Sequence, residues 1–143
     1  MKIANFDLQL NSGWLFHHGK IDKFYDAMAQ NCKAGGHLGN LKRFKEENSW
    51  QEIRVPHDWC IFLPYDKTAN AWSGYKVRGE GWYYLEVNLS DLEIQNARLV
   101  FEGVMGQTVV YVNGNIVKRN FSGYNRFSVD LSCYLVPNAT NTI

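Results

Sequence analysis

The sequence predicts an all-β protein whose strands pair antiparallel and pack as a β-sandwich. Aromatic side chains make up 15% of the 143 residues, and strands accommodate rings well on their pleated surface. Short stretches of alternating apolar and polar residues recur along the second half of the chain. Glycine and asparagine turns separate these stretches at close spacing, which is typical of a sandwich of short strands.

The N-terminal part predicts two short strands followed by an insertion. Apolar residues alternate over Phe6–Leu10 and again over Trp14–Phe16, with a turn at Asn11–Gly13 between them. Residues 20–49 are predicted to form a long polar insertion with one helix, because apolar residues follow a possible cap at Asp22 at helical spacing. These residues are Phe24, Tyr25, Met28 and Cys32, before Gly35 and Gly36.

A long aromatic loop follows the next predicted strand. The alternation of Trp50–Val55 stops at Pro56, which has no amide hydrogen to continue a ladder. No period persists from Pro56 to Gly81, and long irregular loops are usually either functional or disordered. The loop is too rich in rings for disorder, and we expect it to be functional. Its rings include Trp59, Phe62, Tyr65, Trp72 and Tyr75.

The second half of the chain predicts a series of strands around one tight hairpin. The strands cover 82–89, 98–102, 108–112, 116–117 and 127–129, and a last one begins at 141–143. In the first of them, Tyr83, Leu85, Val87 and Leu89 are expected to face the core, and Tyr84 and Glu86 to face away. Asn113-Gly114 predicts a type I′ hairpin turn, and Leu131–Leu135 predicts a single helical turn after Asp130.

Composition excludes several classes of function. Lys and Arg number 15 and Asp and Glu number 14, so the net charge of +1 gives no long-range electrostatic attraction for nucleic acid, and no nucleic-acid partner is expected. No apolar run approaches the roughly 20 residues of a spanning helix, so no membrane partner is expected. The first seven residues lack the apolar stretch of a secretory signal, so either the protein has none or it has been removed. The three cysteines have no paired spacing, so we expect buried, reduced thiols and a cytoplasmic location.

The residues give no catalytic or metal centre. Neither a Gly-x-Ser-x-Gly elbow nor a phosphate-binding glycine loop is present. His17 and His18 would point to opposite faces of a strand, so no metal shared by the two is expected. The stretch Val55–Trp59 combines a flat ring with polar groups, as sugar binding requires. Packing for Trp59 and Trp82 and turn capping for Asp58 are the alternatives.

Several segments of the chain, taken in order along the sequence, resemble the N-terminal domain of glycoside hydrolase family 2 enzymes. Phe6–His17 is similar to the family's F-N-x-x-W-x-F start, Trp50–Trp59 to W-x-x-V-x-L-P-H-D-W, Gly79–Tyr84 to G-x-G-W-Y-R, Phe101–Val104 to F-E-G-V, Tyr111–Gly114 to V-Y-V-N-G, and Gly123–Asp130 to G-Y-x-x-F-x-x-D. Tyr84 stands where the family usually has Arg or Lys. Each motif is short, and it is their order along the chain that makes the resemblance specific.

The resemblance implies a galactose-binding-domain-like jelly roll over residues 1–143, the N-terminal sugar-binding domain of a β-galactosidase-like enzyme. An immunoglobulin-like domain and a (β/α)8 barrel with both catalytic glutamates would lie elsewhere in the parent chain, so no catalytic residue is expected here. We expect the strand begun at Asn141 to continue beyond Ile143. No cofactor or metal is expected, since magnesium or sodium of relatives would depend on residues outside this chain. A β-glucuronidase or β-mannosidase parent stays open.

The resemblance also implies which residues touch the sugar. Asp58 would reach a hydroxyl of the terminal sugar, and His57 and Trp59 would support its position. Trp72 and Tyr75 could line a leaving-group subsite. The expected partners are a β-galactoside or related oligosaccharide and the catalytic barrel of the same parent chain, with a homo-oligomer left open. An autonomous carbohydrate-binding module and a purely structural interdomain scaffold are the competing functions.

Overall fold

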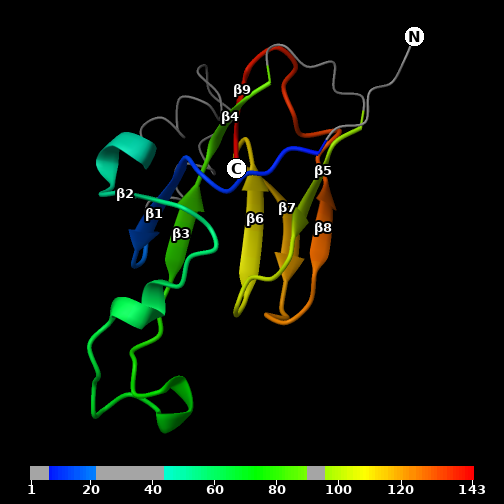
Figure 1. The fold of residues 1–143 in the computed structure, drawn as a ribbon. Coiled ribbons are helices and arrows are strands. Elements are labelled where there is room, and N and C mark those ends of the chain that lie inside the picture. Colours follow the sequence, from blue (N-terminus) through cyan, green and yellow to red (C-terminus); the bar gives the residue numbers. More distant parts are fainter. Residues whose placement is uncertain (1–6, 22–43, 90–95) are drawn as a thin grey trace. The chain divides into compact units, whose positions relative to one another are not determined.

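The computed structural model describes residues 7–21, 44–89 and 96–143, and nearly all of its regular structure is β (Figure 1). The strands are β1 Trp14–His18, β2 Gln51–Ile53, β3 Gly81–Tyr84, β4 Glu86–Asn88, β5 Arg98–Phe101, β6 Thr108–Val112, β7 Asn115–Asn120, β8 Phe127–Asp130 and β9 Thr140–Thr142. Residues 44–47 are helical, and Trp59–Phe62 (η1) and Ala71–Ser73 (η2) are short 3-10 turns. The all-β prediction is confirmed. The helix expected after Asp22 lies outside the described residues.

The chain divides into two compact units. Unit 1 comprises Met1–Lys20 and Trp50–Tyr83, and unit 2 comprises Ile21–Ser49 and Tyr84–Ile143. Each unit has its own sheets and its own buried side chains. A single domain over residues 1–143 stays a prediction.

Unit 1 contains a three-stranded sheet in the order β2-β1-β3. The pair β1–β2 is antiparallel, with Trp14 opposite Ile53 and Phe16 opposite Gln51. Trp14, Phe16 and Ile53 are buried, as the period of two in both segments predicts. These side chains form the apolar floor on which the long loop between β2 and β3 begins.

The strand expected over Phe6–Leu10 is wrong for the residues that the structure describes, because residues 7–10 have no regular structure. Leu8 is 58% exposed, so its apolar side chain gains little from pairing. The Trp14 indole N–H donates to the Leu10 carbonyl at 2.6 Å. The Leu10 carbonyl therefore accepts from a side chain, whereas in a strand it would accept from the backbone amide of a neighbouring strand.

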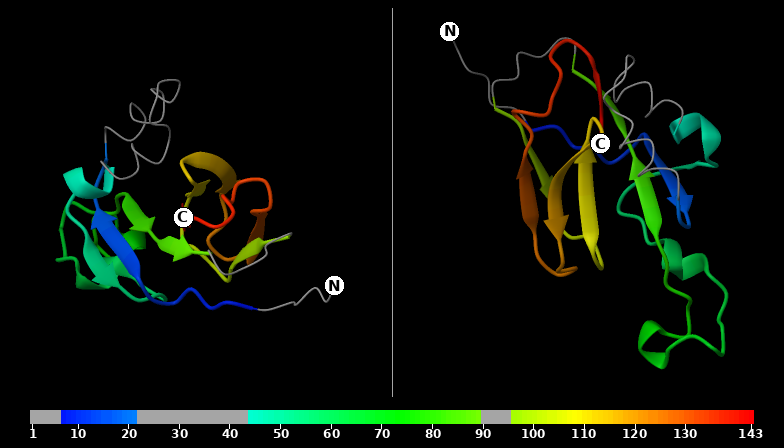
Figure 2. Two further views of the ribbon diagram at one scale, coloured as in Figure 1. Left: turned by 90° about the horizontal axis from the view of Figure 1, so that it is seen from above. Right: turned by 180° about the vertical axis from the view of Figure 1, so that it is seen from behind.

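Unit 2 consists of three antiparallel ladders, β4–β9, β5–β8 and β6–β7. Strands β7 and β8 lie side by side in the views from the front and from behind (Figures 1 and 2). Val112, Val129 and Leu131 are buried at the centre of its core. The partly buried side chains around them are Ala97, Leu99, Phe101, Val117, Phe127 and Leu135.

The predicted strand 82–89 is split into β3 and β4 at Leu85, where the expected alternation fails. Tyr84 and Leu85 are both buried, although neighbouring residues of an unbroken strand face opposite sides. Leu85 exchanges backbone hydrogen bonds of 2.8 and 2.9 Å with Ile143. The Tyr84 hydroxyl donates to Glu86 at 2.9 Å, and the hydrogen bond from Lys45 to Glu86 holds the pKa of that carboxyl below its usual value. A polar partner for its hydroxyl lets Tyr84 turn inward.

The hairpin between β6 and β7 has the predicted turn, with φ of 49° at Asn113 and 82° at Gly114. The side chain of Asn113 adds a role that the turn does not require, because it is buried in a hydrogen-bonded network with Asn141. The network bonds are Asn113 Nδ2 to Asn141 Oδ1 (2.7 Å) and to Tyr134 O (2.8 Å), Thr142 N to Asn113 Oδ1 (2.9 Å), Val136 N to Asn141 Oδ1 (2.7 Å), and Asn141 Nδ2 to Val136 O (3.0 Å) and Ala139 O (3.1 Å). Asn113 therefore does more than shape the turn, because its side chain also connects the turn to the C-terminal segment.

The single turn expected over Leu131–Leu135 is present. The Leu135 amide donates to the Leu131 carbonyl at 3.2 Å, which closes one helical turn. The Asp130 carboxylate accepts from the Ser132 amide at 2.9 Å and caps the turn, as its position predicts.

Candidate functional site: an aromatic arm

Residues 56–80, which make up most of the loop between β2 and β3, are the most distinctive part of unit 1, and we call them the arm (Figure 1). Hydrogen bonds, rather than the burial of apolar side chains, give the arm its shape. Asp58 caps η1 by accepting from the Cys60 amide at 2.9 Å, and Asn70 caps η2 by accepting from the Trp72 amide at 2.9 Å. No residue of either turn is buried.

Polar contacts also hold the two sides of the arm together. Tyr65 and Lys76 form an antiparallel bridge, and the Asp66 amide donates to the Tyr75 carbonyl at 2.7 Å. The Lys76 ammonium donates to the Ile61 carbonyl and lies 5.0 Å from the centre of the Tyr65 ring. The arm therefore has a defined shape without an apolar core of its own.

Because the arm has no core, its rings beyond Trp59 face solvent. Trp72 is 93% exposed and Tyr75 is 50% exposed. Phe62 and Tyr65 are also exposed. A group of exposed apolar side chains on a defined scaffold marks an interaction surface, because a chain that folds without a partner would be more stable with these side chains buried.

A shallow hollow of about 520 Å³ lies beside the Trp72 ring. Asn70, Lys76 and Arg78 also line it, and the Lys76 ammonium itself donates to the Ile61 carbonyl. A flat ring beside hydrogen-bonding groups suits a pyranose, whose C–H faces are apolar and whose rim carries hydroxyls. The two cations would also favour a sugar that carries a carboxylate.

The base of the arm is fixed by His57, which lies over the floor of unit 1. Its Nδ1 lies 3.0 Å from the Tyr83 hydroxyl, and its ring centroid lies 4.8 Å from that of Phe16 in an edge-on contact. The half-buried His57 is thus a structural anchor for the residue that follows it, Asp58.

Trp59 provides the second anchor at the base. Its ring stacks on Phe16 with centroids 6.4 Å apart and packs against His18 at 4.5 Å. A Cβ on Gly81 would lie 2.9 Å from Phe16 and 3.1 Å from the Trp59 indole nitrogen, so only glycine fits beside these rings. His17 contacts Trp50 instead, so the two histidines do face different rings.

Tyr83 makes a pH-dependent contribution to this base. Burial, with the nearby negative charge of Asp58, raises the pKa of its phenol from 10 to about 12. The folded state therefore favours the neutral phenol, so this stability is complete below pH 10 and is lost as pH rises toward about 12. We expect Tyr83→Phe to make urea stability fall less steeply than wild type between these values. Tyr124→Phe, at an exposed position, should keep the wild-type slope.

Asp58 is exposed, and the cap uses its Oδ1. The structure thus shows capping, the structural alternative for Asp58. The second carboxylate oxygen of Asp58 takes no part in the hydrogen bond from the Cys60 amide. Asp58 lies at the base of the arm, whereas Trp72 and Tyr75 lie in and after η2, farther along it (Figure 1). The structure therefore brings His57, Asp58 and Trp59 together and places Trp72 and Tyr75 apart from them.

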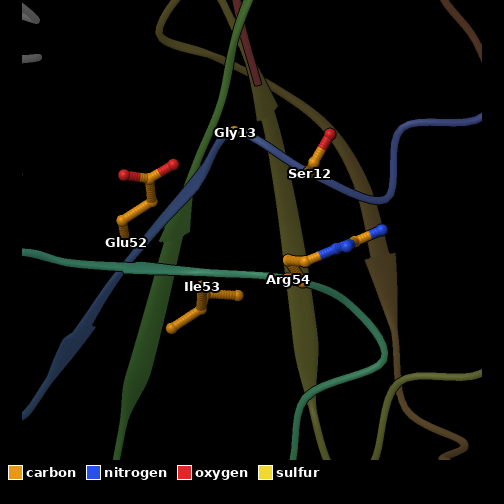
Figure 3. A pocket seen from close by; sticks show the side chains of 5 residues that line it. All are labelled: Ser12, Gly13, Glu52, Ile53 and Arg54. Carbon is orange, nitrogen blue, oxygen red and sulfur yellow. The ribbon is translucent and has the colours of Figure 1, made fainter.

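Sequence reasoning missed a second hollow of unit 1, of about 490 Å³ (Figure 3). At this hollow the side chains of Glu52 and Arg54 point to one side of the backbone and that of Ile53 points to the other. Ser12 and Gly13 also line the hollow. Glu52 and Arg54 are two residues apart at the end of β2, and this spacing is the sequence signal that could have found the hollow. The hollow contains no aromatic ring, so the arm is the stronger candidate for binding a sugar.

Among the described residues, no three His, Cys, Asp or Glu side chains are placed to hold a metal ion. Cys60 and Cys133 are free thiols. Cys133 is exposed and Cys60 is half-buried, so the expectation of buried thiols is wrong for both. In the part of the chain that the structure describes, no helix has the length and apolarity needed to cross a membrane.

Comparison with known proteins places these features in a family. The sequence profile described as "Glycosyl hydrolases family 2, sugar binding domain" matches residues 46–143, which include the arm and strands β2 to β9. A Formosa agariphila protein provisionally named β-glucuronidase is 31% identical over 93 residues, 63% of this chain and 9% of that protein. The β-galactosidase BoGH2A of Bacteroides ovatus is 29% identical over 92 residues, 62% of this chain and 11% of that protein.

The fold is also shared with a solved structure. A β-glycosidase from Bacteroides vulgatus matches 93% of this chain and 16% of its own, with a TM-score of 0.70 and 24% identity. The chain thus corresponds to a small part of each of these proteins. By the match over most of its length, the chain belongs to glycoside hydrolase family 2 and is a sugar-binding domain of that family.

Proposed function

We propose that this chain is the non-catalytic N-terminal domain of a retaining glycosidase acting on β-galactosides, and that the arm forms part of the rim of the sugar pocket. The catalytic glutamates would lie in a barrel domain of the same parent chain, which would be the principal partner of this domain. A jelly-roll connectivity is part of the same proposal. The observation that carries it is the arm, which displays Trp72 and Tyr75 on a hydrogen-bonded scaffold.

In this proposal the two ends of the arm have different tasks. Asp58 accepts a hydrogen bond from a sugar hydroxyl through the carboxylate oxygen that the cap does not use, and His57 and Trp59 hold it in place. Trp72 and Tyr75 form a subsite for the leaving group. A charge-assisted hydrogen bond contributes about 1.5–3 kcal/mol, or roughly ten- to hundredfold in transition-state stabilisation.

A glucuronide is the second candidate substrate. Lys76 and Arg78 line the hollow beside Trp72, and cations there would pair with the carboxylate of a uronic acid. Relatives named β-galactosidase and β-glucuronidase are both found, so the substrate has to be decided by assay. A parental β-mannosidase has no such observation in its favour.

The test is performed in the enzyme that carries this domain, with aryl β-galactoside and aryl β-glucuronide as substrates. Asp58→Ala is expected to lower kcat/KM by about ten- to hundredfold on the true substrate. Asp58→Asn keeps a capping side chain but removes the charge, so it should also lose activity. Lys67→Ala, at an exposed position of the arm, is the matched control and should behave as wild type. Full activity of Asp58→Asn would show that Asp58 acts only as a cap.

Titration of the isolated chain separates the competing functions. Galactose, lactose and glucuronic acid are added while NMR signals of the tryptophan side chains are followed. Saturable binding centred on the Trp72 side chain would favour an autonomous module over a domain that only completes a pocket. A scaffold would bind none of them and would also leave kcat/KM unchanged in the Asp58 and Trp72 variants.

A further inference from the structure

The turn between β6 and β7 holds the one Asn-Gly pair of the sequence, Asn113-Gly114. This pair is chemically labile. Deamidation begins when the backbone nitrogen of the next residue attacks the side-chain carbonyl carbon of asparagine, and glycine hinders that attack least because it has no Cβ. In an unfolded chain, Asn113 would therefore be the asparagine most prone to this reaction.

The folded structure opposes the reaction at Asn113. The Asn113 side chain is 6% exposed and Gly114 is buried. Asn113 Nδ2 donates to Asn141 Oδ1 at 2.7 Å and to the Tyr134 carbonyl at 2.8 Å, and Asn113 Oδ1 accepts from the Thr142 amide at 2.9 Å. The side chain must break these bonds before it can turn toward the Gly114 nitrogen. Burial also limits access of the water that the second step of deamidation consumes.

Every partner of the Asn113 side chain lies in residues 134–143, which we call the C-terminal segment. This segment is held to the rest of unit 2 by the β4–β9 ladder and by the two backbone hydrogen bonds between Leu85 and Ile143. The Asn113 amide also donates to the Thr142 carbonyl at 2.9 Å. Because the side chain is released only when the segment detaches, its reaction rate should follow the population of the detached state.

We propose that Asn113 is a latent deamidation site, which the C-terminal segment protects while it is docked, and that modification of Asn113 prevents the segment from docking again. In the detached state the Gly114 nitrogen forms a bond to Asn113 Cγ. The Cγ–Nδ2 bond breaks, and the Gly114 amide proton leaves with the side-chain nitrogen as ammonia. Water then opens the succinimide ring and gives aspartate or isoaspartate.

The product cannot restore the original contacts. A carboxylate at position 113 only accepts hydrogen bonds, and it would face two acceptors, Asn141 Oδ1 and the Tyr134 carbonyl. Rotating the Asn141 amide by half a turn would remove the acceptor of the Val136 amide and place a donor against it. Isoaspartate would also lengthen the backbone of a two-residue turn. Deamidation therefore acts as a one-way switch on the C-terminal segment.

The first test compares the folded and unfolded chain. The 143-residue chain is incubated at neutral pH with and without denaturing guanidinium chloride, and mass spectrometry of its peptides measures deamidation at Asn113. We expect the folded chain to react about tenfold more slowly or less. Asn11, which is exposed and precedes a serine, is the internal reference and should change far less. Gly114→Ala should slow the reaction in guanidinium. Equal rates at Asn113 in the two states would refute the protection.

The second test asks whether the hydrogen-bonded network is the barrier. Asn141→Ala should speed deamidation of the folded chain about tenfold and leave the rate in guanidinium unchanged. Val129→Ala is the matched control, because it weakens the core of unit 2 without removing a network bond. The variants are compared at guanidinium concentrations that give equal free energies of unfolding. If Val129→Ala then reacts as fast as Asn141→Ala, global unfolding controls the reaction and the inference is wrong.

The third test concerns the consequence of modification. Asn113→Asp reproduces one product, and we expect amide hydrogen exchange at Leu85 and Ile143 to become about tenfold faster. Amides of the β5–β8 ladder should exchange as in wild type. Wild-type exchange at Leu85 and Ile143 would show that the segment docks again after modification. Asp58 and Trp72 enter none of these measurements, so their outcome and that of the proposed function are independent.

Discussion

Replacing Asn141 with alanine is expected to destabilise unit 2 by about 3–5 kcal/mol. Asn141 is fully buried, and its side-chain amide makes four hydrogen bonds, one with Asn113 in the β6–β7 turn and three with the backbone of Val136 and Ala139. Truncation leaves the Asn113 amide and the Val136 backbone groups without these partners, and each unsatisfied buried group costs about 1–3 kcal/mol. Since domains of this size are stable by only about 5–15 kcal/mol, much of the stability would be lost.

Urea unfolding of the full chain measures this effect. Asn141→Asp keeps the acceptor toward Asn113 but loses the donor toward Val136 and Ala139, so it separates the two halves of the network. Asn125→Ala, at an exposed position, should change the free energy of unfolding by less than about 0.5 kcal/mol. A loss below about 1 kcal/mol for Asn141→Ala would mean that water satisfies the freed groups and that the network contributes little.

Phe16→Ala is expected to destabilise unit 1 by about 3–5 kcal/mol, the usual range for a buried phenylalanine. Phe16 is 6% exposed, and its ring lies against His57, Trp59 and Tyr83 with centroids 4.8, 6.4 and 5.0 Å away. Removing it opens a cavity under both anchors of the arm. The arm's base should therefore lose its fixed geometry together with the stability of the sheet.

Tryptophan fluorescence and urea unfolding report the two consequences together. Phe16→Leu refills part of the cavity and should cost less than Phe16→Ala. Phe62→Ala removes a phenylalanine that is 84% exposed on the arm and should leave stability near that of wild type. If Phe16→Ala were no more destabilising than Phe62→Ala, the ring cluster under the arm would not be the core of unit 1.

Features set by neighbouring residues were predictable from the sequence. The Asn113-Gly114 turn follows from the need for two positive φ angles. A strand before Pro56 was also predictable, although β2 ends at Ile53, two residues short of the predicted end at Val55. The turn after Asp130 follows from a side chain that can cap it. The strand expected over Phe6–Leu10 failed because alternation cannot show whether a partner strand is available.

The candidate site was predictable as a composition but not as an arrangement. Five rings in one irregular loop pointed to a functional segment. Which of them pack and which are displayed depends on contacts with other strands. Trp59 lies on Phe16, whereas Trp72 is exposed at η2, and the sequence around the two tryptophans contains nothing that separates them.

By itself, then, the sequence determined the β character, most of the strands and turns, and the family to which the chain belongs. The tertiary structure alone decided the split at Leu85, the inward turn of Tyr84, and the pairing of Asn113 with Asn141 across 28 residues. The physical reason is the range of the interactions. Backbone φ preferences and alternation act between near neighbours, whereas burial of a polar side chain becomes favourable only when the fold brings it a partner from a distant segment.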